Sequence, residues 1–203
     1  SVAAQMSRGK SEKTVAFAMS SVAATLAKFA MDVCLYMSQN FDFISLPAHL
    51  TTGSSIMPHK KNPDVFELIR GKCNKIQALP YEITLITNNL PSGYHRDLQL
   101  LKEGLFPAIQ NLKACLDIAI FSIKDIKLKE NILVDKKYDY LFTVDTLNEM
   151  VVAGMPFRDA YKAVAEQLEN GTYKSPKETK HTHEGSINNL CLKEIKEKME
   201  LAF

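Results

Sequence analysis

A short stretch rich in glycine, serine, lysine and asparagine carries the residue types best suited to chemistry in this chain. It runs Gly53-Ser54-Ser55-Ile56-Met57-Pro58-His59-Lys60-Lys61-Asn62-Pro63. Its glycine and serines give a mobile backbone whose N–H groups can point at an anion. Lys60 and Asn62 add a cation and an amide donor for carboxylates, and a helix starting at Pro63 would add its positive dipole end. The stretch therefore predicts an anion-binding loop that also holds a hydroxyl group.

The same composition also suits a solvated linker with surface lysines, and the residue types alone favour neither interpretation. The surrounding segment from Phe43 to Lys61 is 19 residues long. A structureless segment of that length inside a helical bundle is uncommon unless it has a function.

Three long helical segments should position this loop. In the first, from about Ser11 to Asn40, apolar residues recur at alternating steps of four and three, as in a helical seam. These residues are Val15, Met19, Val22, Leu26, Phe29, Val33 and Tyr36. Alanines fill much of the remaining circumference, so we expect burial among several neighbouring helices. The second helix opens at Pro63 and should kink at Pro80, which lacks a backbone donor; the third runs from about Asp97 to Ile123.

The pattern changes after about Lys129, where shorter helices are expected. Their ranges are 139–153, 156–169 and 190–201. Strand signals are weak throughout, so the predicted fold is all-α. We expect two domains: 1–128, a long-helix bundle that carries the loop, and 129–203, a small helical C-terminal domain.

Composition argues against several classes of protein. The 25 basic and 23 acidic residues give a net charge of +2 without a basic block, so no nucleic-acid partner is expected. No apolar run reaches the roughly 20 residues that cross a bilayer, so no membrane partner is expected. The four cysteines form no C-x-x-C pair, which favours a reducing, cytoplasmic location. His181, His183 and Glu184 lack a further well-spaced ligand, so we predict no metal site.

The Gly53–Pro63 stretch closely resembles the G-S-S-x-M-P-x-K-x-N-P signature of the aspartase/fumarase superfamily, with eight fixed positions in eleven residues. Its members are helical tetramers that eliminate fumarate from succinyl substrates. Within that superfamily, Asn62–Lys72 and Tyr94–Glu103 resemble the argininosuccinate lyase family, which splits argininosuccinate into arginine and fumarate. The resemblance implies that 1–128 is part of the central helical domain of a homotetramer that needs no cofactor.

The resemblance also implies roles for individual residues. Ser54 would be the base that removes a proton from the carbon next to a carboxylate. A serine hydroxyl is a weak base, so loop N–H groups and Lys60 would have to stabilise its alkoxide. Lys60 and Asn62 would hold the carboxylates of the fumarate portion, and Ser55 would supply a supporting hydroxyl.

Glu67 would orient a histidine brought in from another subunit; by its residue type alone it reads as a surface acid on a helix. Tyr94, Gln99 and Lys102 match positions that bind argininosuccinate, and helical spacing would put the last two on one face. The alternative is that the charged residues in this segment solvate the start of a helix.

Some features depart from the family pattern. His59 replaces a glutamine and is more typical of adenylosuccinate lyase, His95 replaces an asparagine, and Leu100-Leu101 replaces an acidic pair. Two further site regions of the family, including the one with its histidine, have no counterpart in this chain, which opens with Ser1. We therefore expect a C-terminal portion that is inactive alone. The alternatives are another fumarate-releasing lyase or a non-catalytic, crystallin-like helical protein.

Overall fold

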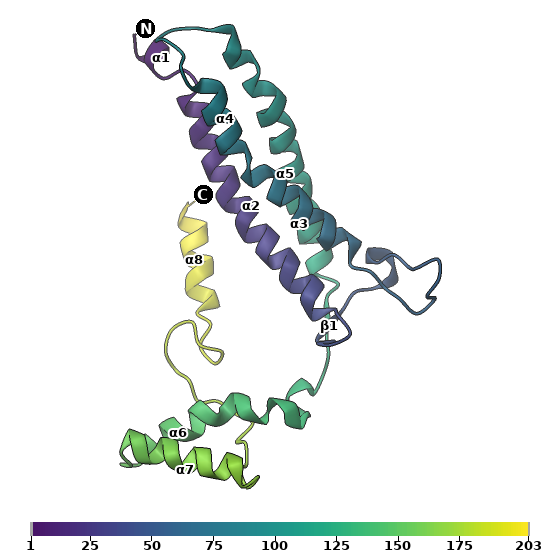
Figure 1. The fold of residues 1–203 in the computed structure, drawn as a ribbon, viewed down its shortest axis with the longest axis vertical. Helices are drawn as coiled ribbons and strands as arrows, with labels where there is room; N and C mark the ends of the chain where they lie inside the picture. The colour runs from purple at the N-terminus through teal and green to yellow at the C-terminus, as the bar shows by residue number, and fades with distance from the viewer. Residues whose placement is uncertain (1, 203) are drawn as a thin grey trace. The chain divides into compact units, whose positions relative to one another are not determined.

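The computed structural model describes residues 2–202, which divide into two compact units, 2–129 and 130–202 (Figure 1). The first contains helices α1 (Val2–Met6), α2 (Lys10–Tyr36), α3 (Asp64–Gln77), α4 (Leu79–Thr87) and α5 (Leu101–Ile123), strands β1 (Ile44–Ser45) and β2 (Lys127–Leu128), and 3-10 turns at Ala48–Leu50 and Arg96–Gln99. The second contains 3-10 turns at Ile132–Val134 and Lys136–Phe142 and helices α6 (Thr143–Val152), α7 (Phe157–Glu169) and α8 (Leu192–Ala202). The predicted all-α fold is confirmed.

The first unit is an antiparallel bundle in which α2 packs against α3, α4 and α5. The buried face of α2 is mostly small: Ala16, Met19, Ala23, Leu26, Ala27, Ala30 and Val33. Small side chains let a neighbouring helix approach closely. Three members of the predicted seam, Val15, Val22 and Tyr36, are instead 45%, 44% and 38% exposed. The predicted helix is confirmed, but its buried face is rotated towards the alanines.

The second predicted helix is two helices in the structure. The break lies at Ala78, and Pro80 occupies the first turn of α4. Proline suits that position because its missing N–H has no intrahelical partner there. The prediction of one continuous, kinked helix was wrong in this detail. The buried face of α3 consists of Phe66, Ile69, Cys73 and Ile76.

The third predicted helix begins later than expected. Arg96–Gln99 forms a 3-10 turn and α5 starts at Leu101, with Pro107 inside it. Tight turns of this kind commonly precede α-helices.

A two-residue antiparallel ladder, which the weak strand signal did not predict, pairs the segment that follows α2 with the segment that follows α5. Ile44 pairs with Leu128 and Ser45 with Lys127. The ladder is extended by Lys129, whose N–H donates to the Phe43 carbonyl at 2.8 Å and whose ammonium pairs with Asp42. It fixes the point at which the chain leaves α2 and enters the loop that carries Ser54.

The core of the bundle holds two thiols between α3 and α5. Cys73 and Cys115 are 0% and 2% exposed. Burial, together with the neighbouring Cys115, raises the pKa of the Cys73 thiol to about 12. Because the thiolate is the reactive form, the raised pKa makes the Cys73 thiol unreactive, and Cys73 acts as a small core residue.

Helix α2 and the stretch Arg96–Ile123 are long and apolar enough to cross a membrane by length and composition. Core helices of soluble bundles meet the same criterion. Both segments pack against other helices of the first unit, and 33% and 22% of their most apolar windows are buried there.

The second unit is built on α6 and α7, which pack through Leu147, Ala160 and Val164. A polar segment follows α7, and His181 Nε2 lies 2.6 Å from Asp145 Oδ1 on α6. His181 thus has a structural partner. Among residues 2–202 no group of three potential metal ligands is found.

Candidate active site

The Gly53–Lys61 loop is closed at its base by Thr52 and Asn62. The two residues exchange backbone hydrogen bonds, 2.8 Å from the Asn62 N–H to the Thr52 carbonyl and 3.2 Å in the other direction. The Asn62 amide nitrogen lies 3.3 Å from the carbonyls of both Thr52 and Gly53. Thr52 also hydrogen-bonds the Asp64 carboxylate in the first turn of α3. The two ends of the loop are therefore held together and tied to α3, so the loop is not a free linker.

Thr52 and Asp64 were not singled out from the sequence. The only available signal was the position of Asp64 after Asn62-Pro63, at a predicted helix start. The contact also changes the picture of Asn62, whose amide N–H groups point at loop carbonyls in this conformation. Its side-chain oxygen takes no part in these bonds.

The Ser54 hydroxyl lies at the centre of the loop's hydrogen bonding. Its oxygen accepts from the backbone N–H groups of Ile56 at 3.2 Å and Met57 at 3.1 Å. The side chain is half-buried. Two backbone donors aimed at one oxygen stabilise negative charge on it. This arrangement provides part of what a serine needs to act as a base.

The other charged and polar residues of the loop face solvent. Ser55 and Lys60 are exposed, and the Lys60 N–H closes a turn by donating to the Met57 carbonyl at 3.1 Å. Among residues 2–202 the Lys60 ammonium forms no ion pair and no hydrogen bond. It is available to an incoming carboxylate.

Glu67 lies on the exposed side of α3, at the same end of the bundle as the loop. Its charge reaches Cys34 of α2. Burial raises the pKa of the Cys34 thiol, the Arg70 guanidinium lowers that pKa, and the Glu67 carboxylate raises it. Arg70 also reaches the Met31 sulfur at 3.0 Å. Glu67 therefore sits near the contact of α2 with α3, and its carboxylate has no ion-pair partner among residues 2–202.

The second predicted group lies in the link from α4 to α5. The Gln99 amide donates to the Tyr94 hydroxyl oxygen at 2.6 Å. Lys102 follows in the first turn of α5 and is exposed. The structure thus brings Tyr94 and Gln99 together, although Gln99 ends a 3-10 turn rather than lying inside an α-helix.

The two groups lie at opposite ends of the bundle. The link carrying Tyr94 is near the start of α2, because a Cβ on Gly9 would meet Thr87 and Leu98. The Ser54 loop follows the far end of α2 (Figure 1). A helix of 27 residues is about 40 Å long at 1.5 Å per residue. One copy of this chain therefore cannot bring Ser54 and Tyr94 to one substrate.

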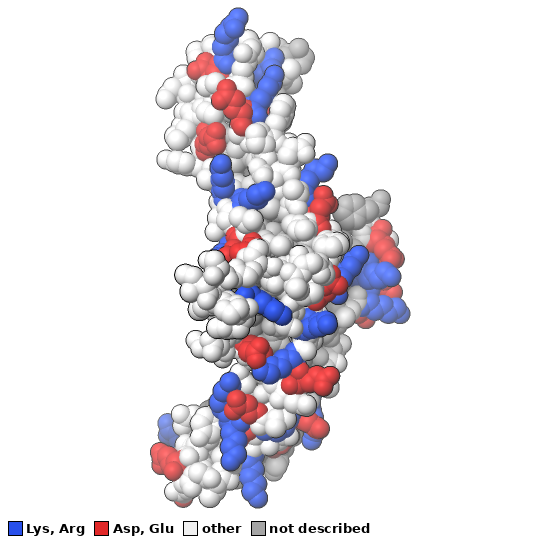
Figure 2. Space-filling view, turned by 90° about the vertical axis from the view of Figure 1, so that its right-hand side faces the viewer, with Lys and Arg blue, Asp and Glu red and all other residues white. Residues whose placement is uncertain are grey.

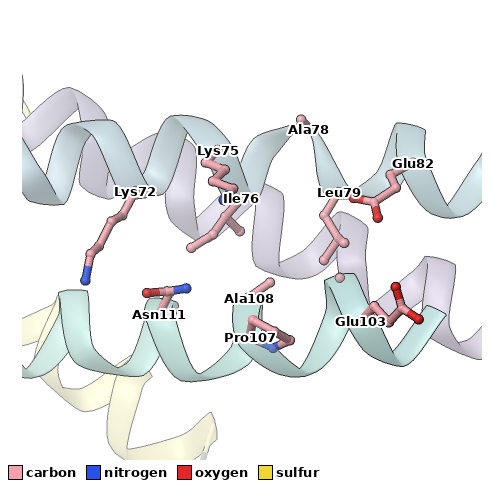
Figure 3. Close-up of a pocket in the computed structure, with 11 residues that line it drawn as sticks. Lys72, Lys75, Ile76, Ala78, Leu79, Glu82, Glu103, Pro107, Ala108 and Asn111 are labelled. Carbon is pink, nitrogen blue, oxygen red and sulfur yellow. The ribbon is translucent and has the colours of Figure 1, made fainter. Parts of the chain in front are cut away.

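A cavity of about 390 Å³ lies between α3, α4 and α5. Figure 3 shows Lys72 near one end and Glu82 and Glu103 near the other, with Leu79 and Ala108 between them. None of the predicted site residues lines this cavity. Its charged side chains are exposed, as on an ordinary helical surface.

Three comparisons relate the chain to known proteins. A lyase family model matches residues 5–78. The argininosuccinate lyase of Parabacteroides distasonis is 59% identical over 194 residues, covering 96% of this chain and 44% of that protein. That of Bacteroides thetaiotaomicron is 55% identical over 199 residues, covering 98% and 45%.

Solved structures share the fold. A class II fumarase from Schistosoma mansoni superposes with a TM-score of 0.66 at 19% identity, over 80% of this chain and 34% of that one. A fumarate lyase:delta crystallin from Brucella melitensis gives 0.60 at 21% identity, over 79% and 35%. The chain spans a little under half the length of the argininosuccinate lyases that it matches. The chain is similar in sequence to the C-terminal portion of argininosuccinate lyases over nearly its whole length, and it shares the fold of these solved structures.

Proposed function

We propose that this chain supplies the fumarate-releasing loop of an argininosuccinate lyase. The observation that carries the proposal is the Ser54 oxygen, which accepts two backbone N–H groups. The Lys60 ammonium in the same loop has no ion-pair partner among residues 2–202. Sequence identity of 55–59% with argininosuccinate lyases supports the choice of substrate. The activity belongs to the assembled enzyme of which this chain is a part.

The proposed elimination removes one proton and breaks one C–N bond. Ser54, as an alkoxide held by the Ile56 and Met57 N–H groups, takes a proton from the succinyl carbon next to a carboxylate. The electron pair left behind is stabilised on that carboxylate, where Lys60 and the Asn62 amide supply positive charge and a hydrogen bond. The pair then forms the double bond of fumarate as the guanidino nitrogen leaves and is protonated. Ser55 adds a hydroxyl next to the base.

Engagement of Asn62 with a carboxylate requires a rearrangement of the loop. In the present conformation its amide nitrogen is 3.3 Å from two loop carbonyls. When the loop closes over a substrate, the Asn62 amide would leave these carbonyls and donate to the substrate carboxylate. Closure would also exclude water from the site. Glu67, on α3 beside the loop, would orient a histidine from another subunit.

We further propose that the active site forms between copies of the chain in a homotetramer. Tyr94, Gln99 and Lys102 bind the arginine portion of the substrate, but they lie about 40 Å from the Ser54 loop of the same chain. The outer faces of the bundle carry exposed apolar residues that association would cover: Val15, Phe17, Val22, Met31, Phe106, Ile120 and Phe121. Light scattering should give the mass of a tetramer for the assembled enzyme; a monomer would contradict this proposal.

Charge and cysteine chemistry agree with a cytoplasmic enzyme for a small substrate. Basic and acidic side chains are interspersed on the face in Figure 2, with no basic stripe that would follow a nucleic acid. All four cysteines are free thiols, which suits a reducing compartment. Cell fractionation would test this assignment, and recovery of the protein in an oxidising compartment would refute it.

A chimaera tests the activity. The 194-residue matching segment of the Parabacteroides distasonis enzyme is replaced by this chain, and fumarate release from argininosuccinate is followed by its ultraviolet absorbance. We expect turnover by the chimaera and none by the 203-residue chain alone. The same assay with adenylosuccinate tests the alternative that His59 raises. A folded, tetrameric chimaera without activity on either substrate would favour the crystallin-like alternative.

A further inference from the structure

We infer that Arg8 is a positioning residue for Tyr94 in the proposed argininosuccinate site. The Arg8 guanidinium carbon lies 5.4 Å from the centroid of the Tyr94 ring, within the range of a cation–π contact. The hydroxyl of the same ring accepts the Gln99 amide at 2.6 Å. The inference rests on the proposed function for its role in substrate binding, but the contact itself can be tested without it.

Tyr94 needs such a restraint because of where it lies. It is 51% exposed, on an irregular link between α4 and α5 that also contains Pro91 and Gly93. A half-exposed tyrosine on a link can change its χ1 rotamer readily. Gln99 holds the hydroxyl and Arg8 lies over the ring face, so the two contacts together define the ring's position.

The backbone that carries Arg8 is itself fixed. Gly9 follows it with φ +75°, is buried, and caps the start of α2. A Cβ at Gly9 would lie 2.5 Å from Thr87 Cγ2, so this turn packs directly on the end of α4. Positive φ and this close approach both favour glycine. The turn therefore places Arg8 beside the Tyr94 link.

Arg8 also lines a small polar cavity next to that link. The cavity measures about 130 Å³ and is bounded by Gln5, Thr87, Gly93 and Leu98 besides Arg8. The guanidinium has donors that the ring face does not use. Through the ring, Arg8 acts on binding of the arginine portion and does not contact the atoms of the C–H bond that breaks.

The first experiment measures the Tyr94 ring directly in the 203-residue chain. 3-Fluorotyrosine is placed at position 94 and its ¹⁹F spectrum is recorded for the parent, Arg8→Met and Arg8→Lys. Loss of the cation should shift the resonance and narrow it as the ring becomes mobile, and lysine should restore part of the parent spectrum. Lys10→Met removes a nearby exposed cation that makes no ring contact and should leave the spectrum unchanged. An unchanged spectrum for Arg8→Met would overturn the inference.

The second experiment measures substrate binding in the chimaera. Arg8→Met should raise the KM for argininosuccinate roughly two- to fivefold, the size of an exposed cation–π contact. The kcat should be unchanged, because binding that is equal in the ground and transition states affects KM alone. In a Tyr94→Leu background the Arg8→Met effect should vanish. An undiminished rise in KM for Arg8→Met in that background would reject the role of the ring. An inactive parent chimaera would instead reject the proposed function, and the ¹⁹F spectra alone would then test the contact of Arg8 with Tyr94.

Discussion

Replacing Ser54 with alanine should lower fumarate release by the chimaera about 10²–10⁴-fold, the contribution of a positioned general base. The substitution removes the side-chain oxygen that accepts the Ile56 and Met57 N–H groups. Because the loop is largely exposed, water can satisfy those two donors in the variant. Assembly and helix content should therefore be retained, as checked by light scattering and circular dichroism.

Ser55→Ala provides the matched control for that experiment. Ser55 is the neighbouring serine and is exposed. It accepts no backbone N–H group from residues 2–202. Loss of one supporting hydrogen bond is worth about 1 kcal/mol, so its effect on turnover should stay below about tenfold. Equal losses for the two variants, or unchanged turnover for Ser54→Ala, would reject Ser54 as the base.

Replacing Phe66 with alanine should reduce the stability of the bundle by about 3–5 kcal/mol. Phe66 is 0% exposed and packs edge-to-face on Phe29 of α2, with ring centroids 5.9 Å apart. Truncation leaves a cavity at the contact of α2 with α3 that the surrounding helices can fill only in part. Native-state hydrogen exchange of α3 amides in the 203-residue chain measures the loss in the first unit.

Leu68→Ala on the same helix is the control for this prediction. Leu68 is 65% exposed, so its truncation should change the opening free energy of α3 by no more than about 0.5 kcal/mol. A loss below about 1 kcal/mol for Phe66→Ala would show that the α2–α3 contact is not the centre of the core.

The positions of the helices could be predicted from apolar spacing because each helix buries one stripe of residues. The buried face of α2 could not be predicted as well. Apolar spacing favours Val15 and Val22, but the bundle buries Ala16 and Ala23, since close approach of α3 depends on small side chains. The break at Ala78 was likewise hidden, because proline in sequence is compatible with either a kink or a new first turn.

The sequence by itself determined the helical class and identified a loop whose residue types suit binding of an anion. Those properties follow from residue type and spacing along one chain, as in Ser54, Lys60 and Asn62. Only the tertiary structure decided which of the candidate residues meet. It closes the loop between Thr52 and Asn62, aims two N–H groups at Ser54, places Arg8 over Tyr94, and sets Tyr94 about 40 Å from Ser54. The contact of Arg8 with Tyr94 and the separation of Tyr94 from Ser54 depend on the packing of segments far apart in the chain. The hydrogen bonds of the loop depend on its backbone conformation, and residue spacing encodes neither.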